Sequence, residues 1–333
     1  MTAAPELASA PVLDVRDLCT HILSDDGVVK AVDGVSFQLL SGEVLGIVGE
    51  SGSGKSVTSL SLMGLTQRPA AFHPRGEVLY RGRDVLRMSE RELERIRGNR
   101  ISMIFQDPMT SLNPYLTVER QLTEVLELHR GMPRRTAQSR ACEMLQRVGI
   151  ADAPRRLRAY PHELSGGMRQ RVMIAMALLC EPDVLIADEP TTALDVTIQA
   201  QILELIQGLR REIGMSVILI THDLGLVAGM ADRVLVMYAG RVVEAAPTRA
   251  IFAAPAHPYT TGLLASTPSL SGAHRAPLRA IAGLPPSLTH LPAGCPFRPR
   301  CGRVVDRCAL ESPAESEIAS GHHARCYNPE HRP

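Results

Sequence analysis

The chain has 333 residues, of which 45% are hydrophobic and 21% charged, and its formal net charge is +1. This composition excludes a disordered chain, and the length allows one large domain or two smaller ones. The near-neutral charge gives no general attraction to nucleic acid, so no nucleic-acid partner is predicted. The N-terminal segment lacks the basic start and apolar core of a secretory signal, and the most apolar run, 172–180, is too short to span a bilayer. We therefore expect a cytoplasmic protein.

Short runs rich in Val, Ile and Leu alternate with longer segments of helical spacing from residue 12 to about residue 250. Such runs are typical of buried strands in a largely parallel sheet, which indicates an α/β fold. The predicted strands are 44–48, 101–105, 184–187, 217–220 and 234–238.

Two segments depart from this alternation. The segment from about 108 to 170 has no comparable apolar run and is rich in Leu, Glu, Arg and Gln, so a helical subdomain is predicted there. Beyond residue 250, prolines recur and hydrophobic periodicity fades. We therefore expect a domain over 1–250 and a separate, irregular, cysteine-containing C-terminal module over 251–333.

Residues 49–56, GESGSGKS, follow the first predicted strand and fit the phosphate-loop pattern G-x-x-x-x-G-K-[ST]. Glycine turns tightly enough to leave successive backbone N–H groups free for phosphate oxygens. Lys55 is one of only two lysines among 36 basic residues, and its compact ammonium suits the β- and γ-phosphates better than a guanidinium. Ser56 is expected to offer its hydroxyl to Mg²⁺. The predicted nucleotide-binding residues of the loop are Gly49, Ser51, Gly52, Ser53, Gly54, Lys55 and Ser56.

Acidic side chains follow a second predicted strand. Asp188 and Glu189 come directly after the run 184–187, and open α/β sheets bind ligands at the carboxyl ends of their strands. Asp188 is predicted to hold Mg²⁺, and Glu189 to polarise the water that attacks the γ-phosphate. His222 follows the strand 217–220, and this position favours a γ-phosphate contact over the structural role that a lone histidine usually has.

Residues 164–170, LSGGMRQ, resemble the signature of ATP-binding cassette (ABC) ATPases, and the other motifs stand in the order of that family. The resemblance covers about 12–250 and implies a RecA-like core with a helical subdomain. It implies that Gln106 is the Q-loop residue, which contacts nucleotide and Mg²⁺, that Asp195 belongs to the D-loop, and that His222 is the switch histidine.

The signature also predicts a partner. Ser165, Gly166 and Gly167 open a helix whose N-terminus suits an anion, and one chain cannot point this end at its own phosphate loop. In the family, two such domains close head to tail on two ATP molecules, each signature facing the partner's nucleotide.

Three further stretches, 105–118 (FQDPMTSLNPYLTV), 257–260 (HPYT) and the C-terminal cysteines, resemble the ATPase subunits of oligopeptide/dipeptide importers, a branch that includes nickel importers. The resemblance implies two separate transmembrane permease subunits, a second ATPase that is commonly a paralogue, and an extracytoplasmic substrate-binding protein. It places the chain peripherally at the cytoplasmic face of the inner membrane. The identity of the cargo stays open.

One departure from the family concerns the adenine base. Members usually stack an aromatic residue on it, but this chain has no Phe, Tyr or Trp between Asp14 and Ser36. His21 or Ile22 is expected to cover the base instead, and an aliphatic contact lacks the aromatic stacking contribution.

Cys295, Cys301, Cys308 and Cys326 crowd together near the C-terminus, which in a cytoplasmic protein favours a metal over disulfides. Their spacing is not the C-x₂₋₄-C pairing usual for structural zinc, so the residues alone leave zinc, a [4Fe–4S] cluster and unligated thiols open. His322 and His323 are near enough in sequence to compete as ligands. The resemblance to peptide importers implies a structural [4Fe–4S] cluster.

Two other classes of nucleotide-binding protein fit the sequence less well than a transport ATPase. Soluble ABC ATPases of DNA repair or translation usually carry coiled coils, zinc fingers, duplicated cassettes or a basic surface, whereas this chain has one cassette and no heptads. A non-enzymatic nucleotide-binding regulator is disfavoured because the residues that hydrolysis needs are all present. A transport ATPase is therefore the preferred interpretation.

Overall fold

The structure is a computed structural model that describes residues 10–106, 111–191, 196–266 and 280–330. Contacts within the chain divide it into two compact units. Unit 1 comprises Met1–Leu13, Gln38–Glu43 and Met88–Ile218, and unit 2 comprises Asp14–Phe37, Val44–Arg87 and Leu219–Pro333. The predicted site residues are divided between the two units.

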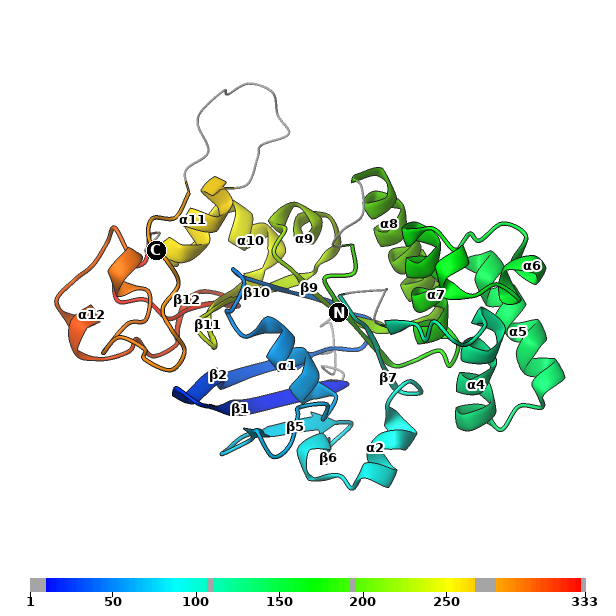
Figure 1. The fold of residues 1–333 in the computed structure, drawn as a ribbon. Helices are drawn as coiled ribbons and strands as arrows, with labels where there is room; N and C mark the ends of the chain where they lie inside the picture. The colour runs from blue at the N-terminus through cyan, green and yellow to red at the C-terminus, as the bar shows by residue number, and fades with distance from the viewer. Residues whose placement is uncertain (1–9, 107–110, 192–195, 267–279, 331–333) are drawn as a thin grey trace, which may run out of the picture. The chain divides into compact units, whose positions relative to one another are not determined.

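Nearly all of an antiparallel sheet lies in unit 2 (Figure 1). Its strand order is β2-β1-β5-β6, with β4 paired to β1. Buried and partly exposed residues alternate along β5, as expected of a strand with one face on a core. Helix α1 (Lys55–Leu62) packs on this sheet, where the hydroxyl oxygens of Ser61 and Thr20 are 2.8 Å apart. The strands are β1 (Leu13–Ser24), β2 (Gly27–Leu39), β4 (Ala71–Phe72), β5 (Glu77–Tyr80) and β6 (Arg83–Asp84).

Unit 2 also contains a second sheet segment with the strand order β12-β13-β11-β10-β3. β3 runs parallel to β10, whereas β11 is antiparallel to both β10 and β13. All five residues of β3 are buried, which accounts for its uninterrupted apolar sequence. The strands are β3 (Val44–Val48), β10 (Arg233–Tyr238), β11 (Arg241–Pro247), β12 (Ser316–Ala319) and β13 (His322–Ala324).

In unit 2, an aromatic cluster of Tyr238, Tyr259 and Phe297 packs the C-terminal segment, which here means residues 257–330 as far as they are described, against β10. The centroid of the Tyr238 ring lies 4.6 Å from that of Tyr259 and 5.2 Å from that of Phe297. Such contacts bury large apolar surfaces and so hold the segment in place. The helices and 3₁₀ turns of this unit, besides α1, are η1 (Val85–Arg87), α9 (Leu224–Met230), α10 (Thr248–Ala253), α11 (Pro258–Ser266), η3 (Arg298–Arg300) and α12 (Arg307–Leu310).

Unit 1 combines two parallel strands, β7 (Ile101–Ile104) and β8 (Val184–Asp188), with a group of helices that Figure 1 shows in green, apart from α2, which is cyan. Helix α4 is capped at both ends, since the Thr117 hydroxyl accepts from the Arg120 N–H and Gly131 follows the last turn in a left-handed conformation. Strand β9 (Ser216–Thr221) is divided, its first three residues belonging to unit 1 and its last three to unit 2. The helices and the 3₁₀ turn are α2 (Glu90–Ile96), α4 (Val118–Arg130), α5 (Arg134–Arg147), α6 (Ala153–Leu157), η2 (Pro161–Glu163), α7 (Gly166–Leu178) and α8 (Val196–Ile213).

The predicted α/β fold class is confirmed, and each predicted buried strand corresponds to one of β3, β7, β8, β9 and β10. The described part of the 108–170 segment is helical, as predicted. The antiparallel sheet was not predicted. The division at residue 250 stays a prediction; residues 219–333 lie in one unit with the phosphate loop, and the described elements between 280 and 330 are short. No helix in the described ranges combines the length and the apolar character needed to span a membrane.

Candidate functional site

The phosphate loop lies in unit 2 between β3 and α1, and two of its glycines are required by close contacts. Gly49 has φ 153°, and a Cβ there would lie 2.2 Å from the Met237 carbonyl oxygen. Gly54 has φ 102°, and a Cβ there would lie 2.3 Å from the Ala31 carbonyl oxygen. The loop is thus pressed against neighbouring backbone, a constraint additional to the tight turn that the sequence predicts.

Lys55 begins α1 and is only 5% exposed. Its Nζ donates to the carbonyl oxygens of Gly49 (2.8 Å) and Glu50 (2.9 Å), so the ammonium lies within the loop. The first turn of α1 contains no acidic residue, and the positive end of its dipole therefore adds to the lysine charge. Of the remaining predicted loop residues, Ser51, Gly52 and Ser56 are exposed and Ser53 is buried.

The predicted catalytic carboxylate lies in unit 1, at the end of β8. Because Ile104 pairs in parallel with Ala187, the segments that follow β7 and β8 begin at the same edge of the sheet. There the Glu189 carboxylate accepts a hydrogen bond from Gln106 Nε2 at 2.8 Å. Asp188 is 4% exposed at the last position of β8. The structure therefore brings together Gln106 and Glu189, which are 83 positions apart in the chain.

The signature residues begin α7 in unit 1. Ser165 is the N-cap, and its hydroxyl accepts from the Met168 N–H at 3.3 Å. A Cβ at Gly166 would meet no atom within 4 Å, and the first turn has no acidic residue. Because there is space beside Gly166 and no acidic side chain offsets the positive end of the helix dipole in the first turn, this helix end suits the anion-binding role that the sequence predicts.

Gln170 connects the signature helix to the catalytic strand end, and the sequence analysis missed it. Its buried side-chain amide donates to the carbonyl of Pro190, the residue after Glu189. The sequence could have indicated this role, because Gln170 stands one helical turn after the two glycines and therefore on the same face of the helix.

The predicted residues are thus shared between the units. Unit 2 contains Lys55, Ser56 and the exposed His222, which follows β9; unit 1 contains Gln106, Asp188, Glu189 and Ser165. The D-loop prediction, Asp195, lies outside the described residues, as does the segment 107–110 after Gln106.

His21, one of the two residues predicted to cover the adenine base, pairs in register with Phe72 of β4. The two rings meet edge to face at 5.7 Å, and Phe72 is 37% exposed. Burial lowers the pKa of His21 below 6.5, which favours the neutral imidazole. The sequence search for an aromatic residue missed Phe72 because strand pairing, not proximity in sequence, brings it to this place.

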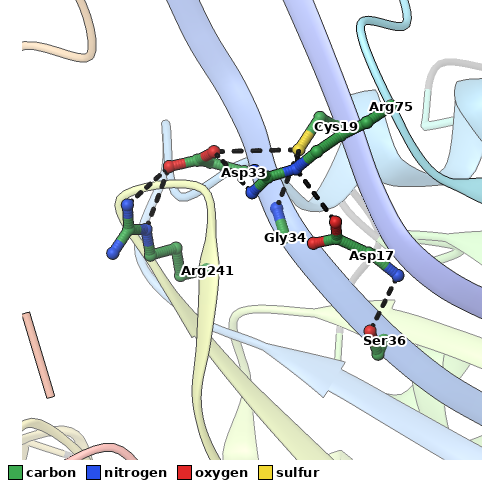
Figure 2. Close-up of polar contacts among 7 residues, drawn as sticks. All are labelled: Asp17, Cys19, Asp33, Gly34, Ser36, Arg75 and Arg241. Atoms are coloured by element: carbon green, nitrogen blue, oxygen red, sulfur yellow. Dashed lines mark hydrogen bonds and ion pairs between the residues drawn. The ribbon is translucent and has the colours of Figure 1, made fainter. Parts of the chain in front are cut away.

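A polar network beside His21 contains Cys19 and Asp33 (Figure 2). The acceptor atoms of these three residues lie within 4.8 Å of one another, close enough to share a metal ion. However, Cys19 Sγ already accepts from Arg75 Nε (3.1 Å) and the Gly34 N–H (3.2 Å).

Asp33 is likewise engaged, because Arg241 donates to its Oδ2 through both Nε and Nη2 at 3.1 and 2.6 Å. Two guanidinium groups therefore surround these acceptors, and their positive charge opposes a cation. Burial raises the pKa of the Cys19 thiol, which also disfavours metal ligation. We interpret the network as structural: it ties β1, β2 and the β10–β11 turn together.

The four C-terminal cysteines are free thiols in unit 2. Burial raises the pKa of Cys326 to about 11, and Cys301, Cys295 and Cys308 lie near enough to add to this shift. The Cys295 N–H donates to the Cys308 carbonyl at 2.9 Å, and Cys301 Sγ accepts from the Arg303 N–H at 3.3 Å. Cys295, Cys301 and Cys308 thus lie near enough to Cys326 to affect its pKa, and the metal cluster that the sequence predicts stays a prediction.

His322 is engaged elsewhere. Its Nε2 lies 2.7 Å from Glu244 Oε1 in the buried pairing of β13 with β11, so it does not compete as a cluster ligand. His323 Nδ1 lies 4.0 Å from Glu315.

Comparison with known proteins identifies the class that these features define. The model of the ABC transporter family matches residues 32–192, and that of the oligopeptide/dipeptide transporter C-terminal region matches residues 243–308. The fold is similar to solved cassettes: the dimeric post-hydrolysis structure of MJ0796 bound to ADP and Pi (29% identity, TM-score 0.64, 71% of this chain and 99% of that chain), and CbiO1 from Clostridium perfringens (30% identity, TM-score 0.62, 73% and 91%).

Curated relatives match along nearly the whole chain. A probable peptide ABC transporter ATP-binding protein of Sinorhizobium fredii, y4tR, is 54% identical over 95% of this chain and 94% of its own length. The oligopeptide transport ATP-binding protein OppD of Salmonella typhimurium is 51% identical over 98% and 96%. The chain belongs to the ATP-binding subunits of ABC transporters, in the branch that carries the oligopeptide/dipeptide C-terminal region, and is an ATPase of that family.

Proposed function

We propose that this chain hydrolyses ATP to power peptide import through a separate pair of membrane permease subunits. The C-terminal region matched over residues 243–308 carries the proposal, because the cassette structures resemble only 71–73% of the chain and this region characterises the peptide-transporting branch. Two relatives above 50% identity are named for peptide transport, which supports the same cargo class.

In the proposed reaction, the γ-phosphate of ATP passes to water and ADP leaves. Lys55 neutralises charge on the β- and γ-phosphates, and Glu189 orients the attacking water. The Gln106 amide, hydrogen-bonded to Glu189 at 2.8 Å, holds this carboxylate in position. His222 contacts the γ-phosphate. Mg²⁺ would supply further charge neutralisation when bound, and the predicted ligands are Ser56, Gln106 and Asp188.

The open end of α7 is proposed to act on the nucleotide of a second ATPase subunit, a paralogue of this chain. Ser165, Gly166 and Gly167 present backbone N–H groups there with no acidic residue in the first turn. Asp195 is expected to join the same interface. The assembled pair is proposed to bind the permeases at the cytoplasmic face of the inner membrane, with an extracytoplasmic protein delivering the cargo.

Reconstitution tests the cargo assignment. The chain, its paralogue and both permeases would be incorporated in proteoliposomes with the binding protein, and uptake of labelled peptides and of nickel measured with ATP on the cytoplasmic side. ATP-dependent peptide uptake is expected. Nickel uptake without peptide uptake would assign the chain to the nickel importers, and copurification with ribosomes or DNA instead of permeases would overturn the transport role.

We also propose that Cys295, Cys301, Cys308 and Cys326 hold a [4Fe–4S] cluster with a structural role. The donor set supports this proposal, because all four thiols are free and the other three lie near enough to Cys326 to add to the effect of burial in raising its pKa. A backbone N–H also donates to Cys301 Sγ, as is common around cluster sulfurs. A bound cluster would deprotonate the thiols whose pKa burial raises.

Anaerobic purification distinguishes the cluster from zinc. The protein is expected to be brown, with about four irons per chain. A colourless, iron-free chain that contains zinc and folds normally would refute the cluster and leave the ATPase assignment intact.

A further inference from the structure

Glu50, the second residue of the phosphate loop, is held by two residues from the C-terminal segment of unit 2. Its carboxylate receives both arms of the Arg300 guanidinium, Nη1 to Oε2 at 2.6 Å and Nη2 to Oε1 at 2.9 Å. Its backbone N–H donates to the hydroxyl of Tyr259 at 2.8 Å. Two-armed pairs of this kind fix orientation as well as distance.

Both anchoring residues are themselves immobilised. The Arg300 side chain is only 4% exposed, and its Nε donates to the Ala282 carbonyl at 3.0 Å. Its guanidinium carbon lies 5.8 Å from the centroid of the Tyr238 ring. Tyr259 is fully buried in the aromatic cluster, with its ring 5.4 Å from that of Phe297.

The HPYT stretch supplies the local geometry that aims Tyr259 at the loop. The His257 N–H donates to Glu244 Oε2 at 2.8 Å, and the Tyr259 N–H donates to His257 Nδ1 at 3.1 Å. This short chain of hydrogen bonds ties the start of α11 to β11. The stretch thus positions a hydroxyl for the backbone of Glu50.

Glu50 in turn shares contacts with the phosphate-binding lysine. Its carbonyl accepts from Lys55 Nζ at 2.9 Å and from the Ser53 N–H at 3.2 Å. The loop contains three glycines in positive-φ conformations, so without outside contacts it would sample many shapes. Fixing Glu50 restricts the peptide groups on both sides of it and the position of Lys55.

We propose that Tyr259 and Arg300 are positioning residues for ATP binding: they hold Glu50 so that the phosphate loop is already in its binding shape before nucleotide arrives. Preorganisation of this kind increases affinity because the cost of ordering the loop is met during folding. The two residues would thereby affect nucleotide affinity through Glu50.

Two substitutions test the proposal on the full chain by equilibrium binding of a fluorescent ATP analogue. Tyr259→Phe removes only the hydroxyl and keeps the ring in its cluster; we expect the Kd to rise about fivefold. Arg300→Gln removes the two-armed pair; we expect about tenfold or more. Tyr327→Phe and Arg298→Gln are the matched controls, since they remove a hydroxyl and a cation from the same C-terminal segment without touching the Glu50 contacts.

A double-mutant cycle separates positioning from general destabilisation. Glu50→Gln and Arg300→Gln should combine non-additively in ATP affinity, because each removes the same interaction. In the assembled transporter, Tyr259→Phe should raise the KM for ATP and leave kcat near the wild-type value. If the Arg300→Gln protein loses iron or unfolds, the Tyr259→Phe protein alone tests the proposal. Wild-type Kd and KM in a folded Tyr259→Phe chain would overturn the proposal.

Discussion

At the scale of single residues, the proposed mechanism gives Lys55 and Glu189 different roles: Lys55 binds the phosphates and Glu189 orients the attacking water. Glu189→Gln keeps the shape of the side chain and removes the charge that orients water, so turnover should fall about 100-fold or more with ATP affinity retained. Lys55→Ala removes the ammonium that meets the phosphates, so binding and turnover should both be lost. Nucleotide binding and phosphate release in the assembled transporter measure the two effects.

Controls for this pair are available in the chain. Glu204→Gln changes an exposed carboxylate on α8, and Lys30→Ala removes the only other lysine. Both variants should behave like the wild type. A Glu189→Gln protein that hydrolyses ATP at the wild-type rate would remove Glu189 from the mechanism.

His21 tests how the base is held. If the neutral imidazole covers adenine, His21→Ala should weaken ATP binding about fivefold and His21→Phe should restore or improve it. Ile22→Ala distinguishes the alternative, since it should then have little effect. Affinities for ATP and GTP measured on the same variants show whether the contact selects the base. A loss with Ile22→Ala but none with His21→Ala would reverse the assignment.

At the scale of elements, the loop before α4 presents an aromatic side chain to its surroundings. Tyr115 is 86% exposed, although its backbone N–H donates to Asn113 Oδ1 at 2.9 Å. Gln121 braces the same loop by donating to the carbonyls of Asn113 and Leu116 at 3.0 Å each. A firmly held loop with an exposed ring suits contact with another protein.

We expect this loop to meet a short permease helix. Tyr115 belongs to the stretch 105–118, which follows the predicted strand 101–105, contains the predicted Q-loop residue Gln106 and resembles the ATPase subunits of peptide importers. A Tyr115→Cys chain should crosslink to a permease subunit in the assembled transporter. Leu128→Cys, at a residue that is 74% exposed on α4, is the matched control and should not. Crosslinks from Tyr115→Cys that never include permease would contradict the assignment.

The junction of β11 and α11 should make folding stability depend on pH. Burial lowers the pKa of His257 from 6.5 to about 4 in the folded chain. Because the folded-state pKa is the lower one, its stabilisation is complete above about pH 6.5 and is lost as the pH falls toward 4, by up to about 3 kcal/mol. Denaturant unfolding from pH 7.5 to 4 measures this loss.

Glu244 titrates in a different range, which provides the control. Burial would raise its pKa, but hydrogen bonds from His322, Ala256 and His257 outweigh burial, so the folded-state pKa is lowered below 4.5. Its stabilisation is therefore present above pH 4.5 and is lost only below that value. His257→Asn should reduce the dependence between pH 6.5 and 4.5 and leave the more acidic part; the residual slope comes from His21, His73 and His129, whose pKa values burial also lowers. An unchanged profile would show that His257 is not buried as a neutral group.

At the scale of the whole molecule, the sequence predicted those strands whose residues are buried on both faces, since uninterrupted apolar runs identify them. It did not predict β4 or β6, which have two residues each and form only because longer strands lie beside them. Motif spacing predicted a phosphate loop, and the structure places that loop between β3 and α1; the nucleotide-binding roles of its residues stay predictions. It missed Phe72 and the Arg300 contact to Glu50, because these depend on pairing between distant segments of the chain.

The pairing of β11 with β13 has a consequence for how the protein is made. Glu244 and His322 are 78 positions apart, and their hydrogen bond joins β11, in the sheet that carries the phosphate loop, to β13. Because a chain leaves the ribosome from its N-terminus, β11 lacks this partner until the 78 residues from Glu244 to His322 have been made. A nascent or prematurely terminated chain would expose β11 as an unpaired edge, open to pairing with other chains.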